Sequence, residues 1–294
     1  MLNRKFCSLA SMSGDEALFG TAPNYKIWVL IEYRLPWRKK AVTDNELSEN
    51  QQAHLSALME KNPDLQILFI KQKANSHPSI NIFIARLGIQ STLSRIILTS
   101  HADMLNISND QIINGHPDEI IVNEPHFFVC TNGTRDVCCS KFGLPVYQSL
   151  TEIAGENAWQ CSHIGGHRFA PTMLVFPLGI ALGRVQPDDI PDVIQYINSG
   201  KLPLAHLRGR LNYTGVVQAA EYLILSNHKK SAGKLTFLES RNIEKDEWQV
   251  KMTDSDKNIY TVNLLEIKKL PAIHSDCDPT IPKHVKQYKL IKFS

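Results

Sequence analysis

The stretch APTMLVFPLGIALGRVQPDDIPDVIQYI, residues 170–197, has the clearest local pattern in the chain. A proline opens it, and two apolar runs, 172–176 and 180–185, follow with a Pro-Leu-Gly segment between them. Proline and glycine supply the backbone dihedrals of a tight turn, so the two runs predict a β-hairpin. Pro187 and the acidic residues after it favour a helix start, because proline fits the first helical position and carboxylates stabilise a helix N-terminus. The stretch therefore predicts strand, turn, strand and helix.

Four side chains of metal-binding types precede this stretch. Cys130 and Cys139 have eight residues between them, His163 and His167 have three, and each pair is predicted to lie in a loop that follows a strand. Two thiolates and two neutral imidazoles form a four-ligand set that suits Zn²⁺ or a [2Fe–2S] cluster. Structural zinc sites usually place about two to four residues between paired cysteines. Eight is long for zinc, but the spacing alone leaves both metals open.

The segment between the two histidines favours a loop. Gly165 and Gly166 disfavour a helix there. A glycine loop lets the backbone approach a bulky centre closely, with its N–H groups available to sulfide. Buried core cysteines and surface histidines are the simpler alternative, since a free cysteine is often a small core side chain. The occurrence of both pairs in loops favours the ligand interpretation.

The rest of the chain alternates strand and helix patterns, which predicts an α/β fold. Residues 100–117 are polar and rich in Asn and Asp, and we interpret them as a linker. The tail from Leu270 contains prolines and is predicted to be irregular, and no internal repeat is visible. The remaining predictions are strands at 25–33, 65–70, 80–86, 95–99, 126–130 and 158–161, helices at 44–61, 142–154 and 216–227, and three strands between 234 and 268.

Composition and charge exclude several classes of protein. A hydrophobic fraction of 43% and a net charge of +3 exclude global disorder and give a nucleic-acid partner little electrostatic support. The longest apolar run, Thr172 to Gly183, is too short for a membrane span and contains Pro177. Six cysteines in a chain of 294 residues do not suggest a disulfide scaffold. We therefore expect a soluble cytoplasmic protein.

Two resemblances extend these interpretations. The order of proline, strand, turn, strand and helix resembles the second half of a thioredoxin fold, in which that proline is cis, so a cis bond is expected before Pro171. The motifs CTNGTRDVCC (130–139), SHIGGHRFAP (162–171) and RGR…VQAAE (208–221) resemble the sucrase/ferredoxin-like family over most of the chain. The ligand region also resembles thioredoxin-like [2Fe–2S] ferredoxins, with two histidines in place of a cysteine pair.

The family resemblance implies a ferredoxin domain with a bis-histidinyl [2Fe–2S] cluster. Cys130 and Cys139 are the expected ligands of one iron, and His163 and His167 of the other. Neutral imidazoles in place of thiolates should raise the reduction potential above that of all-cysteine ferredoxins. Because imidazole ligands titrate, we expect the potential to fall as the pH rises. We predict an electron carrier rather than a turnover enzyme, with unknown donor and acceptor proteins.

The predicted division of the chain follows this resemblance. Residues 1–118 form an N-terminal α/β domain, 119–200 a thioredoxin-like [2Fe–2S] ferredoxin domain, and 201–294 a C-terminal helix with a β-meander. The family commonly has histidine where this chain has Asn132, which is not expected to be a ligand. The residues expected to lie near the cluster without binding it are Asn132, Arg135, Cys138, Gly165, Gly166, Arg168 and Pro171.

Other functions are alternatives to the predicted electron carrier. A zinc-stabilised Cys2His2 binding module would use the same four side chains without a redox role. A hydrolase, which the family name suggests, would need two carboxylates flanking the scissile bond, and no acidic pair stands out. Thioredoxin-type chemistry is disfavoured because the sequence has no C-x-x-C motif. We interpret Cys7, Cys161 and Cys277 as structural. We interpret Cys138 as a packed thiol, and the spacing of seven residues from Cys130 leaves it open as a ligand in place of Cys139.

Overall fold

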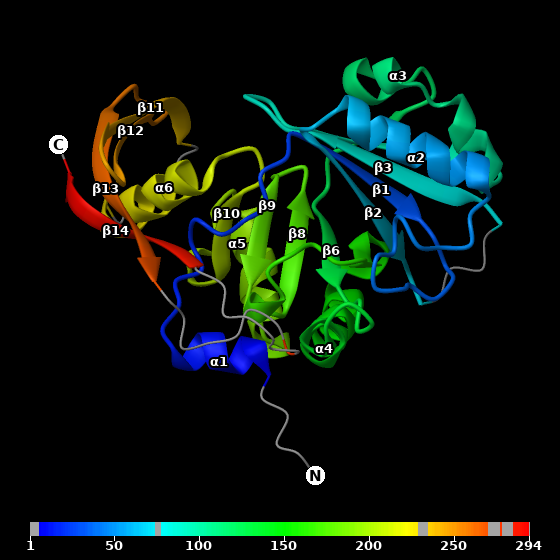
Figure 1. Ribbon diagram of the computed structural model, residues 1–294, viewed down its shortest axis with the longest axis horizontal. Coiled ribbons are helices and arrows are strands. Elements are labelled where there is room, and N and C mark those ends of the chain that lie inside the picture. Colours follow the sequence, from blue (N-terminus) through cyan, green and yellow to red (C-terminus); the bar gives the residue numbers. More distant parts are fainter. Residues whose placement is uncertain (1–5, 74–77, 229–234, 270–276, 278–284, 294) are drawn as a thin grey trace, which may run out of the picture.

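The computed structural model describes residues 6–73, 78–228, 235–269, 277 and 285–293, and its strands form two sheets, of ten and four strands (Figure 1). The strands are β1 (Ile27–Glu32), β2 (Leu65–Lys71), β3 (Ile80–Arg86), β4 (Thr92–Leu98), β5 (Ile120–Val122), β6 (His126–Cys130), β7 (Ala158–Cys161), β8 (Thr172–Phe176), β9 (Ile180–Gly183), β10 (Leu207–Arg210), β11 (Thr236–Glu244), β12 (Glu247–Thr253), β13 (Ile259–Lys269) and β14 (Val285–Phe293). The α-helices are α1 (Cys7–Ser13), α2 (Glu49–Lys61), α3 (Asn109–Asn114), α4 (Val137–Ala154), α5 (Ile190–Asn198) and α6 (Gly215–His228), and the 3-10 turns are η1 (His101–Asn106), η2 (Gly155–Asn157), η3 (His167–Phe169), η4 (Pro187–Asp189) and η5 (Leu204–His206).

The ten-stranded sheet contains one arrangement twice. In its first half, β1 pairs parallel with β2 and antiparallel with β3, and β3, β4 and β5 follow as antiparallel neighbours. In its second half, β6 pairs parallel with β7 and antiparallel with β8, and β8, β9 and β10 follow in the same way. Helices α2 and α4 lie inside the βαβ units, and α3 and α5 follow the fourth strands. Each half is therefore thioredoxin-like with one added edge strand, a repeat that is present in topology although none was visible in the sequence.

The two halves join edge to edge and fold face to face. Strand β2 pairs antiparallel with β7, so the strand order is β10-β9-β8-β6-β7-β2-β1-β3-β4-β5. The sheet faces without helices enclose a shared core, in which the ring centroids of Phe83 and Phe128 are 5.8 Å apart and those of Trp28 and Phe176 are 6.0 Å apart. Since helices cover the opposite faces, β1 and β6 are buried almost throughout.

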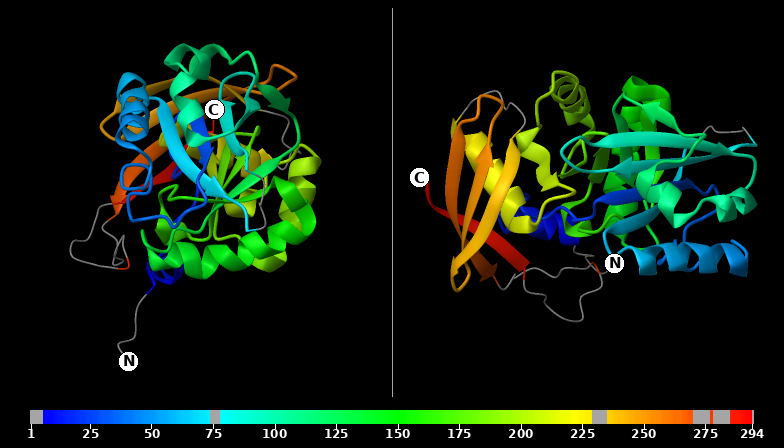
Figure 2. Two further views of the ribbon diagram at one scale, coloured as in Figure 1. Left: turned by 90° about the vertical axis from the view of Figure 1, so that its right-hand side faces the viewer. Right: turned by 90° about the horizontal axis from the view of Figure 1, so that it is seen from above.

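The helices lie on the outer faces of the two halves (Figures 1 and 2). Apolar side chains of α2 and α3 pack on the first half, and those of α4 and α5 pack on the second. Beyond the second half, α6 packs on the antiparallel sheet β11-β12-β13-β14. Figure 2 shows this sheet at one end of the molecule and the first half at the other. No helix among the described residues is long and apolar enough to cross a membrane.

Local patterns predicted many elements correctly. Strands β6, β7 and β8 have the predicted bounds, β2 and β9 differ by one or two residues, and α5 follows the turn at Pro187. The peptide bond between Ala170 and Pro171 is cis, as the thioredoxin resemblance predicts. Helix α2 begins at Glu49 instead of residue 44, because Ser48 and Gln51 form a capping box there.

Three further predictions were wrong. Residues 100–117 are not a linker, because η1 and α3 lie there and bury Met104 and Ile112 against the first half. Helix α4 begins at Val137 rather than residue 142, because the Asp136 side chain accepts a hydrogen bond from the backbone N–H of Cys138. The tail contains β14, whose alternating polar and apolar residues pair with β13 at the sheet edge. Apart from Cys277, the rest of that tail before β14 lies outside the described residues.

Candidate metal centre

Two of the predicted ligands lie where β6 leads into α4. Cys130 is the last residue of β6. The sequence predicts a loop at Cys139, but this residue lies at the start of α4. Helix and strand approach closely, since a Cβ on Gly143 would lie 2.3 Å from the carbonyl oxygen of Cys130. Both cysteines are buried. The connection between strand and helix therefore brings the two sulfurs to one place.

His163 adds a nitrogen donor to these two sulfurs. It follows β7, which pairs parallel with β6, so the loops after the two strands lie side by side. Its Nδ1 atom is 3.6 Å from Sγ of Cys139 and 3.9 Å from Sγ of Cys130. The three ligand atoms all lie within 4.8 Å of one another. Sulfur and imidazole nitrogen suit both an iron–sulfur cluster and zinc.

The two thiols of this group differ in acidity. A hydrogen bond with Cys139 lowers the pKa of Cys130 well below its usual value, and the contact with His163 lowers it further. The hydrogen bond to Cys130 raises the pKa of Cys139, and burial raises it too. The thiolate is the form that binds metals. Because its pKa is lowered, Cys130 forms a thiolate more readily than Cys139 and is the better metal ligand of the two.

His167 lies beside this group and bonds a carboxylate. The centroid of its ring is 5.3 Å from that of His163. Its Nδ1 atom is 2.9 Å from Oδ2 of Asp136 and 3.5 Å from Sγ of Cys7. In metal sites, a carboxylate on one ring nitrogen orients the imidazole so that the other nitrogen serves as ligand. The structure thus gathers three of the four predicted ligands and places the fourth next to them, against Asp136.

Asp136 was not among the residues predicted to lie at the site, although it flanks the ligands in the sequence. It is buried at the start of α4. Although burial raises its pKa, the hydrogen bond and charge of His167 hold the pKa well below the usual range of a carboxyl group. An aspartate before a helix is recognisable as an N-cap in sequence. Its pairing with His167 depends on the conformation of the loop after β7, and no local sequence pattern indicates it.

Glycines and Arg208 shape the loop that carries both histidines. Gly165 and Gly166 have φ values of +97° and +73°, in the left-handed region that favours glycine. A Cβ on Gly166 would lie 2.5 Å from Nη2 of Arg208. Arg208 is buried, donates hydrogen bonds to the carbonyls of Gly165 at 3.1 Å and Thr21 at 2.5 Å, and has its pKa lowered to about 9 by burial. It is a positioning residue, and its place in the RGR motif was its only sequence signal.

The other residues expected near the site hold the surrounding loops. The Asn132 side chain donates to the carbonyl of Arg38 at 3.2 Å, which ties the β6–α4 loop to the first half. Arg168 bonds Glu16 at 2.7 Å. Arg135 is partly exposed and donates its backbone N–H to the Asn132 side chain. These contacts fix the loops around the donors.

A second group of sulfurs lies beside His167. We name Cys7, Cys138 and Cys277 the thiol triad. Sγ of Cys138 is 3.1 Å from that of Cys277 and 3.6 Å from that of Cys7, and all three cysteines are free. Hydrogen bonds from Cys7 and Ser8 lower the pKa of Cys138 to about 6, whereas burial is the main cause that raises the pKa of Cys277 to about 12. Cys161, by contrast, is buried in the core between the halves, as predicted.

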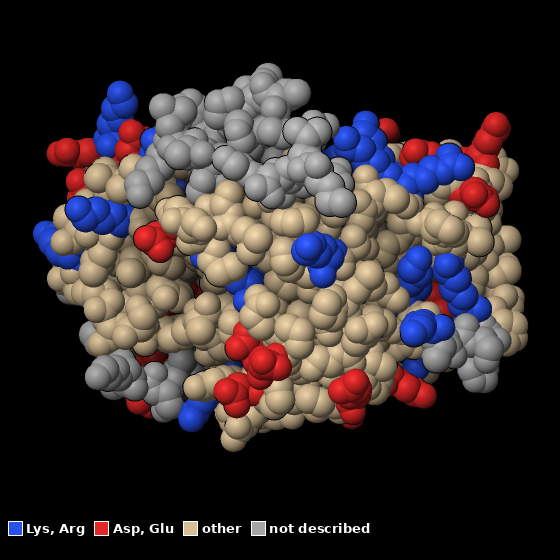
Figure 3. Space-filling model, turned by 90° about the horizontal axis from the view of Figure 1, so that it is seen from below, with Lys and Arg blue, Asp and Glu red and all other residues tan. Residues whose placement is uncertain are grey.

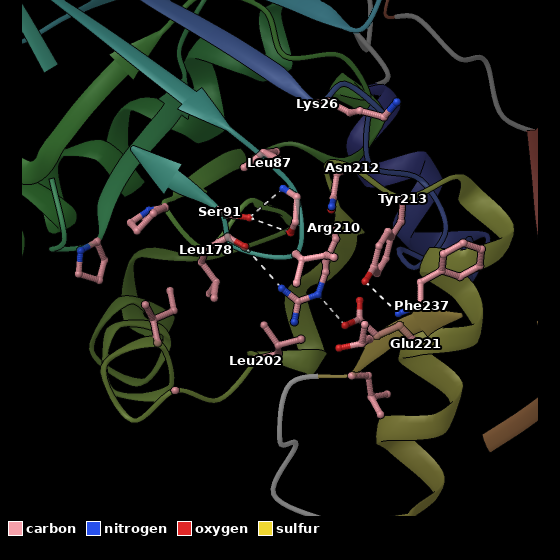
Figure 4. A pocket seen from close by; sticks show the side chains of 18 of the residues that line it. Lys26, Leu87, Ser91, Leu178, Leu202, Arg210, Asn212, Tyr213, Glu221 and Phe237 are labelled. Carbon is pink, nitrogen blue, oxygen red and sulfur yellow. Dashed lines mark hydrogen bonds and ion pairs between the residues drawn. The ribbon is translucent and has the colours of Figure 1, made fainter. Parts of the chain in front are cut away.

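A cavity of about 630 Å³ lies apart from these sulfurs (Figure 4). Its walls are largely apolar, with Leu87 from the first half, Leu178 from the second and Phe237 from β11. Nε of Arg210 bonds Oε1 of Glu221 at 2.6 Å within it, and the Glu221 side chain is buried. None of the four predicted ligands lines this cavity, so it is separate from the candidate metal centre.

A family model described as sucrase/ferredoxin-like matches residues 18–209. The chain belongs to this family. The family match runs from before β1 almost to the end of β10, so it covers both halves of the ten-stranded sheet and all four predicted ligands. The family resemblance of the cysteine and histidine motifs is thereby confirmed.

Two curated relatives carry the name Altered inheritance of mitochondria protein 32. The one from Candida glabrata is 27% identical over 135 residues, which are 39% of this chain and 43% of that protein. The one from Meyerozyma guilliermondii is 24% identical over 106 residues, or 32% of this chain and 38% of that protein. The matched segments thus span less than half the length of these two relatives.

Among solved structures, similarity is found to the thioredoxin-like [2Fe–2S] ferredoxin from Aquifex aeolicus. Its structure matches with a TM-score of 0.26 and 17% identity, over 29% of this chain and 91% of that chain. Its Cys55Ser variant matches with a TM-score of 0.25 and 18% identity, over 29% of this chain and 97% of that chain. The thioredoxin-like character of this family member follows from its own strand order and directions.

Proposed function

We propose that this protein carries single electrons on a [2Fe–2S] cluster held by Cys130, Cys139, His163 and His167. The observation that supports this most directly is the group of donors at the ends of β6 and β7. Two sulfurs and one ring nitrogen lie there within 4.8 Å of one another. His167 lies alongside, 5.3 Å from His163 between ring centroids. Membership of the sucrase/ferredoxin-like family is consistent with this function.

The charges of these side chains suit the proposed ligand set. Cysteine binds metals as the thiolate, and the pKa of Cys130 is already well below its usual value. Two neutral imidazoles leave the set with less negative charge than four thiolates would. When bound, the cluster supplies a one-electron couple whose potential this lower charge raises.

Neighbouring side chains position the histidines. The Nδ1–H of His167 donates to Asp136 at 2.9 Å, which holds a proton on that atom, so that Nε2 would be the ring nitrogen available to iron. Arg208 fixes the glycine loop through the Gly165 carbonyl. Both cysteines are buried, whereas His163 is partly exposed. We therefore assign the His163 side of the site to electron entry and exit.

The redox partners would be recognised by local surface features. Figure 3 shows Lys and Arg as well as Asp and Glu side chains on one face, in small groups among largely uncharged surface. With a net charge of only +3, the field of the whole molecule contributes little to steering a partner. The cytoplasmic location and the absence of a nucleic-acid partner stay predictions from sequence.

Purification of the full chain tests the proposal. We expect a brown protein with visible absorption, about two irons per chain and an EPR signal that appears on reduction with dithionite. A colourless protein that holds zinc at Cys130 and Cys139 would support the zinc-stabilised binding module instead.

Histidine substitutions test the ligand assignment. His163→Cys and His167→Cys each exchange a neutral imidazole for a thiolate, so we expect the colour to remain and the potential to fall. His126→Cys is a matched control, because His126 is buried at the opposite end of β6 and should leave spectrum and potential unchanged. The assignment is wrong if either ligand variant behaves like this control.

A further inference from the structure

The thiol triad is not used by the proposed iron site. Cys7 begins α1, Cys138 lies in the first turn of α4, and Cys277 lies between β13 and β14. The Sγ–Sγ distances are 3.1 Å for Cys138 and Cys277, 3.4 Å for Cys7 and Cys277, and 3.6 Å for Cys7 and Cys138. A disulfide would need about 2.05 Å, so the structure holds three separate thiols whose sulfurs converge.

A carboxylate oxygen faces the same point. Oδ1 of Asp136 is 3.3 Å from Sγ of Cys277 and 4.0 Å from Sγ of Cys7. The four ligand atoms of Asp136 and the triad lie within 4.8 Å of one another, and only Cys277 is not fully buried. Thiolates and a carboxylate so close together repel one another in a buried site unless a cation neutralises them.

Zn²⁺ suits this donor set. It binds cysteine sulfur at about 2.3 Å in tetrahedral geometry, so two sulfurs on one ion lie roughly 3.8 Å apart. The observed separations of 3.1 to 3.6 Å are slightly shorter, so a small outward shift of the sulfurs admits the ion. Hydrogen bonds already reach two of them, from the backbone N–H of Cys7 to Cys277 at 3.3 Å and from the Ser8 hydroxyl to Cys138 at 3.4 Å. Outer hydrogen bonds of this kind orient the ligands of metal sites.

We propose that Cys7, Cys138, Cys277 and Asp136 bind one Zn²⁺ ion at a structural site separate from the proposed iron site. Four protein ligands close the coordination sphere, which is typical of structural zinc. The ion would tie Cys7 at the start of α1 and Cys277 to the first turn of α4, and it would join residues 270 positions apart. The other oxygen of Asp136 bonds His167, so the zinc site would also brace the histidine loop.

Metal analysis of the full chain, purified under reducing conditions, tests this site. We expect about one zinc per chain in the wild type and at least a fivefold lower zinc content in Cys277→Ser, with iron retained. The double variant Cys130→Ala/Cys139→Ala should lose iron and keep its zinc. Cys161→Ser is the matched control, because Cys161 is buried but belongs to neither donor group, and it should keep both metals.

Cobalt gives a readout on the wild-type chain, which does not depend on the folding of a variant. Co²⁺ exchanged for zinc should show thiolate-to-cobalt charge transfer and the visible bands of a tetrahedral ion. Wild-type protein supplied with zinc that shows neither bound zinc nor these bands would overturn the proposal. A Cys138–Cys277 disulfide, found by mass spectrometry after alkylation at lysis, would overturn it too.

Metal contents distinguish a failure of the electron-carrier proposal from a failure of the triad zinc site. If the Cys130 group held zinc in place of a cluster, the wild type would contain about two zincs per chain, and Cys130→Ala/Cys139→Ala would contain about one. That result would support the triad site and refute the electron carrier. Iron without any zinc would support the carrier and refute the triad site.

Discussion

The two halves of the ten-stranded sheet share one topology and carry different chemistry at the same place. In each half, the first two strands are parallel neighbours, so their C-terminal ends lie side by side, and a loop connects the first strand to a helix. In the second half this strand ends at Cys130, within the group of metal donors. In the first half it ends at Glu32, a buried carboxylate that bonds Nε of Arg34 at 2.8 Å and Nδ2 of Asn81 at 2.6 Å. One fold thus presents a donor group in one half and an internally bonded carboxylate in the other.

The connecting loops account for this difference. The β6–α4 connection spans only residues 131–136, so the first turn of α4 brings a sulfur to the strand end. The β1–α2 connection spans residues 33–48 and borders a cavity of about 510 Å³ lined by Tyr33, Pro78 and His101 among others. A short connection holds two side chains together, whereas a long one leaves space between strand and helix. The fold is therefore repeated in the two halves, whereas the presence of a donor site depends on the length of the loop after the first strand.

The largest effect we expect is the loss of metal from the second half when a donor is removed. Cys130→Ala should lower the iron content at least tenfold, because a cluster with one ligand missing is not held. Cys161→Ala is the matched control, since both cysteines are fully buried and pair in register on adjacent strands. Iron analysis and visible absorption measure both, and equal loss in the two variants would contradict a site specific to the Cys130 group.

The next effect concerns the close contact of α4 with β6. In Gly143→Ala the new Cβ would lie 2.3 Å from the Cys130 carbonyl oxygen, and overpacking of this kind costs about 1–3 kcal/mol of unfolding free energy. Gly88→Ala is the control in the first half, because the nearest atom to its Cβ would be 3.8 Å away. Urea denaturation should show the control within about 0.5 kcal/mol of wild type. Similar unfolding free energies for both variants would argue against the tight contact.

A third prediction concerns the pH dependence of the potential, which only the half that carries the proposed ligands His163 and His167 can produce. Reduction adds negative charge near the imidazole ligands and favours their protonation, so the potential should fall as the pH rises, by at most about 59 mV per pH unit for one proton per electron. Redox titrations at several pH values measure the slope. The double variant His163→Cys/His167→Cys should have none, and a flat profile in the wild type would contradict the prediction.

The smallest effect is on the pH dependence of stability. Burial lowers the pKa of His126 in the second half and that of His54 in the first. Between its usual value of about 6.5 and the lower folded pKa, each histidine is protonated in the unfolded chain but neutral in the folded one, so stability should fall as the pH drops through this range. His126 is the more deeply buried, so His126→Gln should weaken this dependence more than His54→Gln. Urea midpoints above and below this range test it, and the reverse order would contradict it.

Local patterns predicted the regular elements well and failed where the burial of a few apolar side chains determines the structure. The β8–β9 hairpin was readable from Pro177, Gly179 and the apolar runs beside them. The polar composition of residues 100–117 predicts a linker, because their few apolar side chains give no periodic signal, yet Met104 and Ile112 lie in the core of the first half. The repeat was missed for a similar reason, since strand order and direction are shared by the halves while side chains are not.

The sequence by itself determined the α/β class, the family and the four residues proposed as ligands, because these depend on short-range patterns and on motifs such as HIGGH. Only the tertiary structure decided that Asp136 faces His167 and that Cys7, Cys138 and Cys277 meet. The reason is physical, since contacts between residues as far apart as Cys7 and Cys277 form only when the whole chain packs around a common core. No local propensity encodes such a contact.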